Sequence, residues 1–154
     1  YVVDIMEKRL EKAMELGADG VINGKEKDAV EEVLRLTDGK GCDLAVETAG
    51  TEFTTVQTIH MTKKGSNIVL VGYSKSGEMT LPMSLVLDKE LTFKTVFRYR
   101  HIYPMAIEAV AAGKVNLKGI ATNIFSLDEV QKPMDYSVSN KADIVKAVIR
   151  ITEE

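Results

Sequence analysis

Hydrophobic positions along the chain alternate between short apolar runs and segments with a helical period. Runs typical of strands occur over residues 1–4, 21–22, 43–47, 67–73, 91–97, 120–125 and 144–151. Apolar positions three or four residues apart, typical of amphipathic helices, occur over residues 7–16, 28–36, 52–61 and 101–112. Strands that alternate with helices of this length predict βαβ units. We therefore expect an α/β fold with a doubly wound parallel sheet and helices on both of its faces.

Turn and cap residues mark two boundaries between these predicted elements. Lys64 and Gly65 should turn the chain into the strand over residues 67–73, which is apolar throughout and is therefore expected to be buried on both faces. Ser126 and Glu129 have the spacing of a capping box, in which the serine hydroxyl accepts from a helical amide and the glutamate reaches back. A helix is therefore expected to start at Ser126.

Length, charge and cysteine content narrow the function classes. The chain of 154 residues suits one domain, and its net charge of −3 gives no indication of nucleic acid or an anionic membrane as a partner. The single cysteine, Cys42, excludes an intrachain disulfide and a cysteine-based zinc cluster. No secretion signal is visible, so a cytoplasmic location is expected. Tyr1 opens the chain inside a strand-like run, which suggests a fragment of a longer protein.

An acid at the end of the first strand is one candidate ligand-binding residue. Asp4 closes the run over residues 1–4, and dinucleotide folds place a carboxylate there to bind the adenosine ribose, which favours NAD over NADP. Arg9 follows in the first helical turns, where it could stack near the adenine. The alternative is an acid that caps the next helix beside a solvated arginine. The glycine-rich phosphate turn should lie about 20 residues before this acid, and only three residues precede Asp4.

Two further strands end in small residues. Ala49 and Gly50 follow the strand over residues 43–47, and Val71, Gly72 and Tyr73 end the next one. Ligands of open α/β sheets bind beyond the carboxyl ends of strands, and small residues let a flat ring approach the backbone. The alternative is simple turn chemistry without a ligand.

A polar and aromatic cluster follows the strand over residues 91–97. Phe97, Arg98 and Tyr99 form its centre, and Arg98 could bind a polyhydroxylated substrate or a carboxylate. His101 and His60 are interpreted as surface histidines, because no second ligand lies at metal spacing. Cys42 is interpreted as a buried structural thiol. No metal-binding residue is predicted.

Four motifs in this order resemble the zinc-dependent medium-chain alcohol and polyol dehydrogenases. They are Val2-Val3-Asp4 with Arg9-Leu10, Gly41-Cys42-Asp43 with Glu47-Thr48-Ala49-Gly50, the segment from Lys64-Gly65 to Val71-Gly72, and Val96-Phe97-Arg98-Tyr99. The last motif is similar to the sorbitol and xylitol branch in particular. The resemblance covers essentially the whole chain.

The resemblance implies a Rossmann-type sheet of strand order 3-2-1-4-5-6 that lacks its first strand and its glycine-rich turn. Residues 1–125 would form a truncated NAD-binding domain, and residues 126–154 a helix and strand on the side of the catalytic domain. Residue by residue, it places Asp4 and Arg9 at the adenosine, Ala49, Gly50, Val71, Gly72 and Tyr73 along the cofactor, Phe97 near the nicotinamide, and Arg98 and Tyr99 near the substrate. Zinc in that family polarises the alcohol oxygen, and its ligands come from the N-terminal domain. No zinc ligand is therefore assigned to this chain.

The function implied is oxidation of a secondary alcohol of a polyol to a ketone, by hydride transfer to NAD. The isolated chain is expected to be inactive and to bind NAD weakly or not at all. Dimers of this family pair sheet edges at the strand from Leu91 to Phe97, so a homo-oligomer is expected. Two alternatives stay open: a non-enzymatic module that only oligomerises, and a methyltransferase-like domain that binds S-adenosylmethionine, since such domains also place an acid after the second strand.

Overall fold

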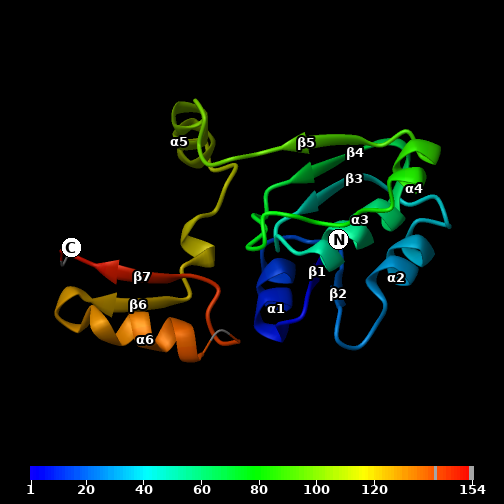
Figure 1. The fold of residues 1–154 in the computed structure, drawn as a ribbon. Coiled ribbons are helices and arrows are strands. Elements are labelled where there is room, and N and C mark those ends of the chain that lie inside the picture. Colours follow the sequence, from blue (N-terminus) through cyan, green and yellow to red (C-terminus); the bar gives the residue numbers. More distant parts are fainter. Residues whose placement is uncertain (141, 153–154) are drawn as a thin grey trace. The chain divides into compact units, whose positions relative to one another are not determined.

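The computed structural model describes residues 1–140 and 142–152 as an α/β chain (Figure 1). The strands are β1 (Val2–Asp4), β2 (Val21–Asn23), β3 (Cys42–Glu47), β4 (Thr62–Leu70), β5 (Thr92–Thr95), β6 (Asn123–Ser126) and β7 (Ala147–Arg150). The helices are α1 (Glu7–Glu15), α2 (Ala29–Leu36), α3 (Glu52–Met61), α4 (Met83–Asp88), α5 (Tyr103–Ala111) and α6 (Gln131–Ser139). Two 3₁₀ turns are η1 (Lys118–Ile120) and η2 (Leu127–Glu129).

All strand pairs of the described residues are parallel, which confirms the predicted fold class. They form three separate sheets of order β1-β2, β3-β4-β5 and β6-β7. In the order 3-2-1-4-5-6, β1 and β2 correspond to strands two and three, and β3, β4 and β5 to strands four, five and six.

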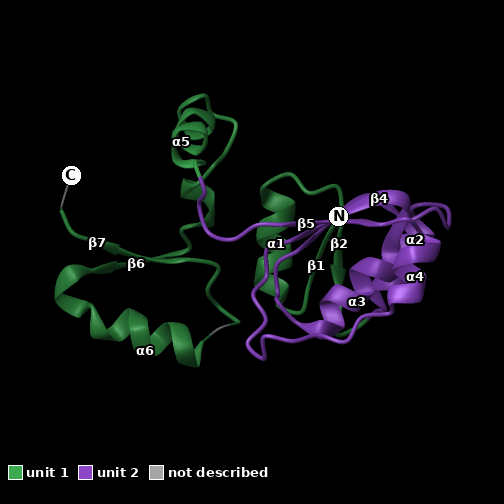
Figure 2. Ribbon diagram, turned by 45° about the horizontal axis from the view of Figure 1, so that its top comes forward, with its two compact units in different colours: residues 1–26, 101–154 green, residues 27–100 purple. Residues whose placement is uncertain are grey.

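The chain divides into two compact units, which Figure 2 colours separately. Unit 1 contains residues 1–26 and 101–154, and unit 2 is the continuous segment of residues 27–100. Unit 1 therefore holds the β1-α1-β2 motif and the β6-β7 pair with α6. Unit 2 holds the three-stranded sheet with α2, α3 and α4.

The core of unit 2 lies on one face of its sheet. Ala45 of β3 and Ile68 of β4 are buried side by side in register, and Ile59 of α3 and Val86 of α4 cover them. On the opposite face, Leu44 and Val46 remain 55% and 54% exposed. The helices of unit 2 thus cover a single face of its own sheet. Asp28 starts α2 in this unit, because its carboxylate accepts from the amides of Val30 and Glu31.

Unit 1 has two small apolar centres. Leu10 of α1 and Ile22 of β2 are buried within the β1-α1-β2 motif. Gly17 ends α1 with a φ of 101°, a conformation that favours glycine. In the C-terminal part of the unit, Phe125 of β6 and Tyr136 of α6 bring their ring centroids to 6.1 Å.

Two predicted strands have different limits in the structure. The strand predicted over residues 67–73 is β4, which begins at Thr62 and ends at Leu70. Lys64 and Gly65 therefore lie inside β4 and not in a turn before it. The reason is a register shift, because Cys42 pairs with Thr62 and Leu44 with Asn67, so β4 carries three additional residues between these pairs.

The strand predicted from Leu91 to Phe97 is also shorter, since β5 covers Thr92–Thr95. It lies at the edge of the three-stranded sheet, as expected.

The capping box predicted at Ser126 is wrong. Within the described residues, the Ser126 side chain makes no capping hydrogen bond, and the chain continues as η2. The helix α6 begins only at Gln131. Ser126 itself is the last residue of β6, which starts at Asn123, later than the strand predicted over residues 120–125.

Candidate functional site

Two adjacent strands of unit 2 end in turns that are bonded to each other. The main-chain oxygen of Glu47, at the end of β3, accepts from the amides of Val71 (2.8 Å) and Gly72 (3.0 Å), just beyond β4. Because β3 and β4 are parallel neighbours, their carboxyl ends meet at one edge of the sheet. We call residues 47–50 and 71–73 together the strand-end rim. It contains five of the residues that the sequence singled out as cofactor-binding candidates.

The two halves of the strand-end rim approach so closely that only glycine fits at two positions. Gly50 has a φ of 70°, and a Cβ atom added there would lie 2.6 Å from the main-chain oxygen of Tyr73. A Cβ atom on Gly72 would lie 2.1 Å from the nitrogen of Gly50. Both distances are far below a van der Waals contact. The two turns of the rim are therefore in direct contact, and no ligand atom fits between Gly50 and Gly72.

The buried carboxylate of Glu47 accepts hydrogen bonds from the strand-end rim. Glu47 is only 3% exposed, and its Oε1 accepts from the amides of Ala49 (2.8 Å) and Gly50 (2.9 Å) and from the hydroxyl of Thr54 (2.8 Å). The sequence reasoning placed Glu47 in a motif but assigned it no role. The signal was available, because an acid inside an apolar strand three residues before a glycine needs nearby donors once it is buried.

An exposed aromatic and cationic cluster lies beside the rim. Val96 extends β5 by donating to the main-chain oxygen of Leu70, so Phe97 follows β5 next to the end of β4. The ring centroids of Phe97 and Tyr73 are 6.2 Å apart, and the two side chains are 67% and 78% exposed. The Arg98 guanidinium lies 5.2 Å from the Phe97 centroid, at cation–π distance. The structure thus brings together three residues that the sequence placed in two separate motifs.

Arg98 has unusual backbone geometry within this cluster. Its φ is 55°, in the left-handed region that favours glycine, and the neighbouring Tyr99 is exposed. His101 has a similar φ of 53°, and both His101 and His60 are exposed, as predicted for surface histidines. Cys42 is half-buried, with its Sγ atom 3.8 Å from the Thr62 hydroxyl, so it is less enclosed than the predicted buried thiol.

Asp4 lies in unit 1 at the carboxyl end of β1, where the sequence placed it. Its Oδ1 accepts from the amides of Ile5 (2.7 Å) and Met6 (2.9 Å), and its Oδ2 lies 3.6 Å from the Arg9 guanidinium. The carboxylate therefore contributes to the loop that leads into α1, which fits the capping alternative in part. The structure also pairs Asp4 with Arg9, the two residues assigned to the adenosine. The ligand roles predicted for these and the preceding residues stay predictions.

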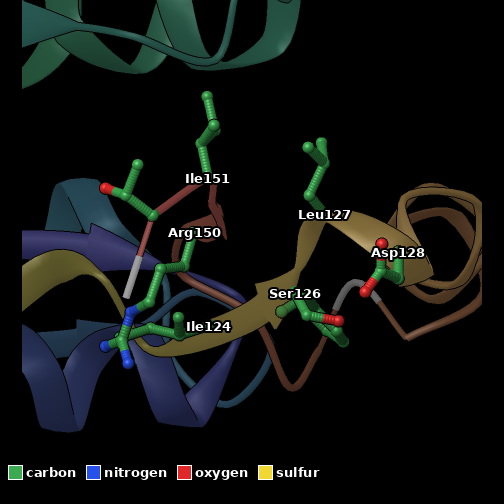
Figure 3. A pocket seen from close by; sticks show the side chains of 8 residues that line it. Ile124, Ser126, Leu127, Asp128, Arg150 and Ile151 are labelled. Carbon is green, nitrogen blue, oxygen red and sulfur yellow. The ribbon is translucent and has the colours of Figure 1, made fainter. Parts of the chain in front are cut away.

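A shallow pocket of about 360 Å³ lies at the carboxyl ends of β6 and β7 in unit 1 (Figure 3). Its lining residues are Ile124, Phe125, Ser126, Leu127, Asp128, Arg150, Ile151 and Thr152. In this view Leu127 and Ile151 point the same way, whereas the Arg150 guanidinium points away from Asp128. The polar groups of the pocket therefore do not converge on a common point, and the pocket does not have the features of a ligand site.

The described part of the chain contains neither a metal-ligand set nor a membrane-spanning helix. Within residues 1–140 and 142–152, no group of three or more His, Cys, Asp or Glu side chains could hold a metal ion. A zinc site thus does not fit the residues that the structure describes. None of the described helices combines the length and the apolar character needed to cross a bilayer.

Comparison with known proteins gives matches over nearly the whole chain. The family model described as zinc-binding dehydrogenase matches residues 1–112. The zinc-type alcohol dehydrogenase-like protein YdjJ of Escherichia coli is 39% identical over 99% of this chain and 43% of its own length. The sorbitol dehydrogenase of Bacillus subtilis is 32% identical over 96% of this chain and 42% of its own length.

A solved structure agrees with these relatives. The crystal structure of an Escherichia coli oxidoreductase/dehydrogenase of unknown specificity superposes with a TM-score of 0.89 at 38% identity, over 98% of this chain and 43% of that one. The resemblance drawn from the four sequence motifs is therefore confirmed. The chain spans less than half the length of the relatives it matches.

Proposed function

This chain belongs to the zinc-binding dehydrogenase family, and from that premise we propose that it is the NAD-binding part of a polyol dehydrogenase. In this proposal the whole protein oxidises a secondary alcohol of a sorbitol- or xylitol-type polyol to a ketone. The bound NAD supplies the chemistry by accepting a hydride from the alcohol carbon. The residues of this chain bind and orient the cofactor and contribute to the substrate pocket.

The observation that carries the proposal is the meeting of three strand ends in unit 2. The Gly50 turn after β3, the Val71–Tyr73 segment after β4 and the Phe97–Arg98 segment after β5 follow adjacent parallel strands. Dinucleotides lie across the carboxyl ends of such strands. The exposed rings of Tyr73 and Phe97 offer flat apolar surfaces to a nicotinamide, and this supports the predicted order of contacts.

Asp4 supplies the nucleotide specificity in this proposal. Its Oδ1 is occupied by two main-chain amides, so Oδ2 is the atom that would accept from a ribose hydroxyl. A carboxylate in this position repels a 2′-phosphate, which favours NAD over NADP. Arg9 balances the charge at 3.6 Å and leaves the carboxylate half-exposed.

Arg98 and Tyr99 are the proposed substrate contacts. The guanidinium of Arg98 has several donors and is held over the Phe97 ring, which leaves its edges free to donate to polyol hydroxyls. We assign no step to zinc within this chain, because its described residues offer no ligand set. The proposal has three further parts. Residues 126–154 lie on the side of the catalytic domain, the protein is cytoplasmic, and it forms a homo-oligomer through the β5 edge.

The test is a titration of the purified 154-residue chain, followed by NMR. We expect NADH at millimolar concentration to shift the amide signals of Gly50, Gly72, Tyr73 and Phe97, with an affinity weaker than micromolar because the chain contains no glycine-rich phosphate turn. NADPH should shift them less, and Asp4→Asn should reduce this difference. A separate sample of the chain with NAD and sorbitol should form no NADH.

Two results would contradict the proposal. Shifts that NADH causes only outside the strand-end rim and Phe97 would place the cofactor elsewhere. Shifts at the rim with S-adenosylmethionine but not with NADH would favour the methyltransferase-like alternative.

A further inference from the structure

We propose that Glu47 is a positioning residue that sets the shape of the strand-end rim, and that Thr54 holds its carboxylate in place for that purpose. This inference rests on the proposed cofactor function of the rim. Glu47 contacts neither cofactor nor substrate in this scheme. It acts through the backbone that the cofactor would meet.

The burial of Glu47 is the first step of the argument. A carboxylate that is 97% removed from solvent is costly to keep in a fold unless donors surround it. The core residue next to it on the same face, Ala45, shows that an apolar side chain is accepted at this depth. The donors around Glu47 therefore explain why an acid stands at position 47.

The second step is that Glu47 bonds both halves of the rim. Its side chain accepts from the amides of Ala49 and Gly50, and its main-chain oxygen accepts from those of Val71 and Gly72. One residue thus orients four amides of the two turns. A Cβ atom added at Gly50 or Gly72 would overlap the other half of the rim, so the two halves are in close contact. A small displacement of Glu47 must therefore move both halves.

The third step links this carboxylate to the start of α3. The Thr54 hydroxyl donates to Glu47 Oε1 at 2.8 Å, and the Thr51 hydroxyl, 2.7 Å from it, is then the donor to Thr54. Thr51 also caps α3, because its hydroxyl accepts from the Thr54 amide at 3.1 Å. The chain of hydroxyls from Thr51 through Thr54 therefore fixes Glu47 relative to a helix that packs on the core.

A matched pair of variants separates this role from simple packing. Thr54→Ser keeps the hydroxyl and loses a methyl group, whereas Thr54→Val keeps the branched shape and loses the donor. Glu47→Gln keeps the size of the side chain but places an amide donor beside the donating Gly50 nitrogen. We expect the effects of these variants on the rim to follow the hydrogen bonds that each one loses, and not the change in side-chain volume.

The experiment measures amide hydrogen exchange and NADH titration on the full chain. In Glu47→Gln and Thr54→Val, exchange at Ala49 and Gly50 should become at least about tenfold faster, with Ile59 and Ile68 unchanged. The NADH midpoint should rise at least about threefold in Thr54→Val and should be restored in Thr54→Ser. Should Glu47→Gln not fold, the Thr54 pair gives the same comparison.

The outcomes distinguish this inference from the function on which it rests. Equal exchange rates at Ala49 and Gly50 in wild type and Thr54→Val would overturn the positioning role, whatever NADH does. Equal NADH midpoints for Thr54→Val and Thr54→Ser would overturn it for the cofactor site. Faster exchange in a protein whose wild-type rim shows no response to NADH would support the role of Glu47 in the turns and contradict the proposed cofactor.

Discussion

Replacing Gly72 by alanine should destabilise unit 2 strongly through steric overlap alone. The φ of Gly72 lies outside the left-handed region, so the backbone itself would accept alanine. The new methyl group would nevertheless lie 2.1 Å from the nitrogen of Gly50 and 2.6 Å from Oε2 of Glu47. Neither neighbour can yield easily, because the first is main chain and the second is a buried, hydrogen-bonded carboxylate.

The expected size follows from the bonds that must give way. Forcing one methyl group into a packed site costs about 1–3 kcal/mol or more. The displacement also weakens the bonds from Gly50 to Glu47 and from Gly72 to Glu47, at about 1 kcal/mol each. The total is about 3–5 kcal/mol. Gly77→Ala is the control, since its φ is 77° with open space among the described atoms, and it should cost only about 1–2 kcal/mol for the backbone.

Urea unfolding followed by circular dichroism compares the two variants under identical conditions. A Gly72→Ala protein that loses no more stability than Gly77→Ala would refute the close packing of the strand-end rim. An intact rim in that variant, visible as unchanged amide signals of Gly50, would refute it independently.

Two further outcomes are expected. Hydrogen bonds from Arg35 and then Lys27 lower the pKa of Glu32 from 4.5 to about 2, so the stability that this carboxylate adds should be present above pH 4.5 and lost as the pH falls through 2. Glu32→Gln should therefore flatten the urea-derived stability profile between these values, and an unchanged slope would contradict the assignment. At the β5 edge, Val96→Lys should weaken self-association by about tenfold in sedimentation, whereas a wild-type monomer at all concentrations would exclude the proposed interface.

Local pattern was sufficient for several elements and insufficient where pairing decides the structure. The helix expected over residues 52–61 matches α3, because Thr51 caps it and the chain turns into β4 directly after Met61. The limits of β4 could not be read from composition. Its early start depends on the pairing of Thr62 with Cys42, and its end at Leu70 depends on the bonds from Val71 and Gly72 to Glu47.

The candidate site, too, was predictable from the sequence only in part. Motif order brought the residues of the rim and of Phe97–Arg98 into one hypothesis, and strand adjacency in unit 2 agrees with it. An acid in an apolar strand three residues before a glycine was a signal for Glu47, but its hydrogen bonds with Thr54, Val71 and Gly72 follow only from the fold. Ser126 illustrates the opposite error, because a capping-box spacing has no effect where the chain forms a 3₁₀ turn instead of a helix.

The division of the chain into units has a consequence for synthesis on the ribosome. Residues 27–100 of unit 2 leave the exit tunnel as one uninterrupted stretch, and they can begin to fold as soon as they emerge. Residues 1–26 and 101–154 of unit 1 are separated by that stretch, so the contacts between them can form only after residues 27–100 have been made. Unit 1 therefore depends on contacts between distant segments of the chain, which form later in synthesis than the contacts of the continuous unit 2.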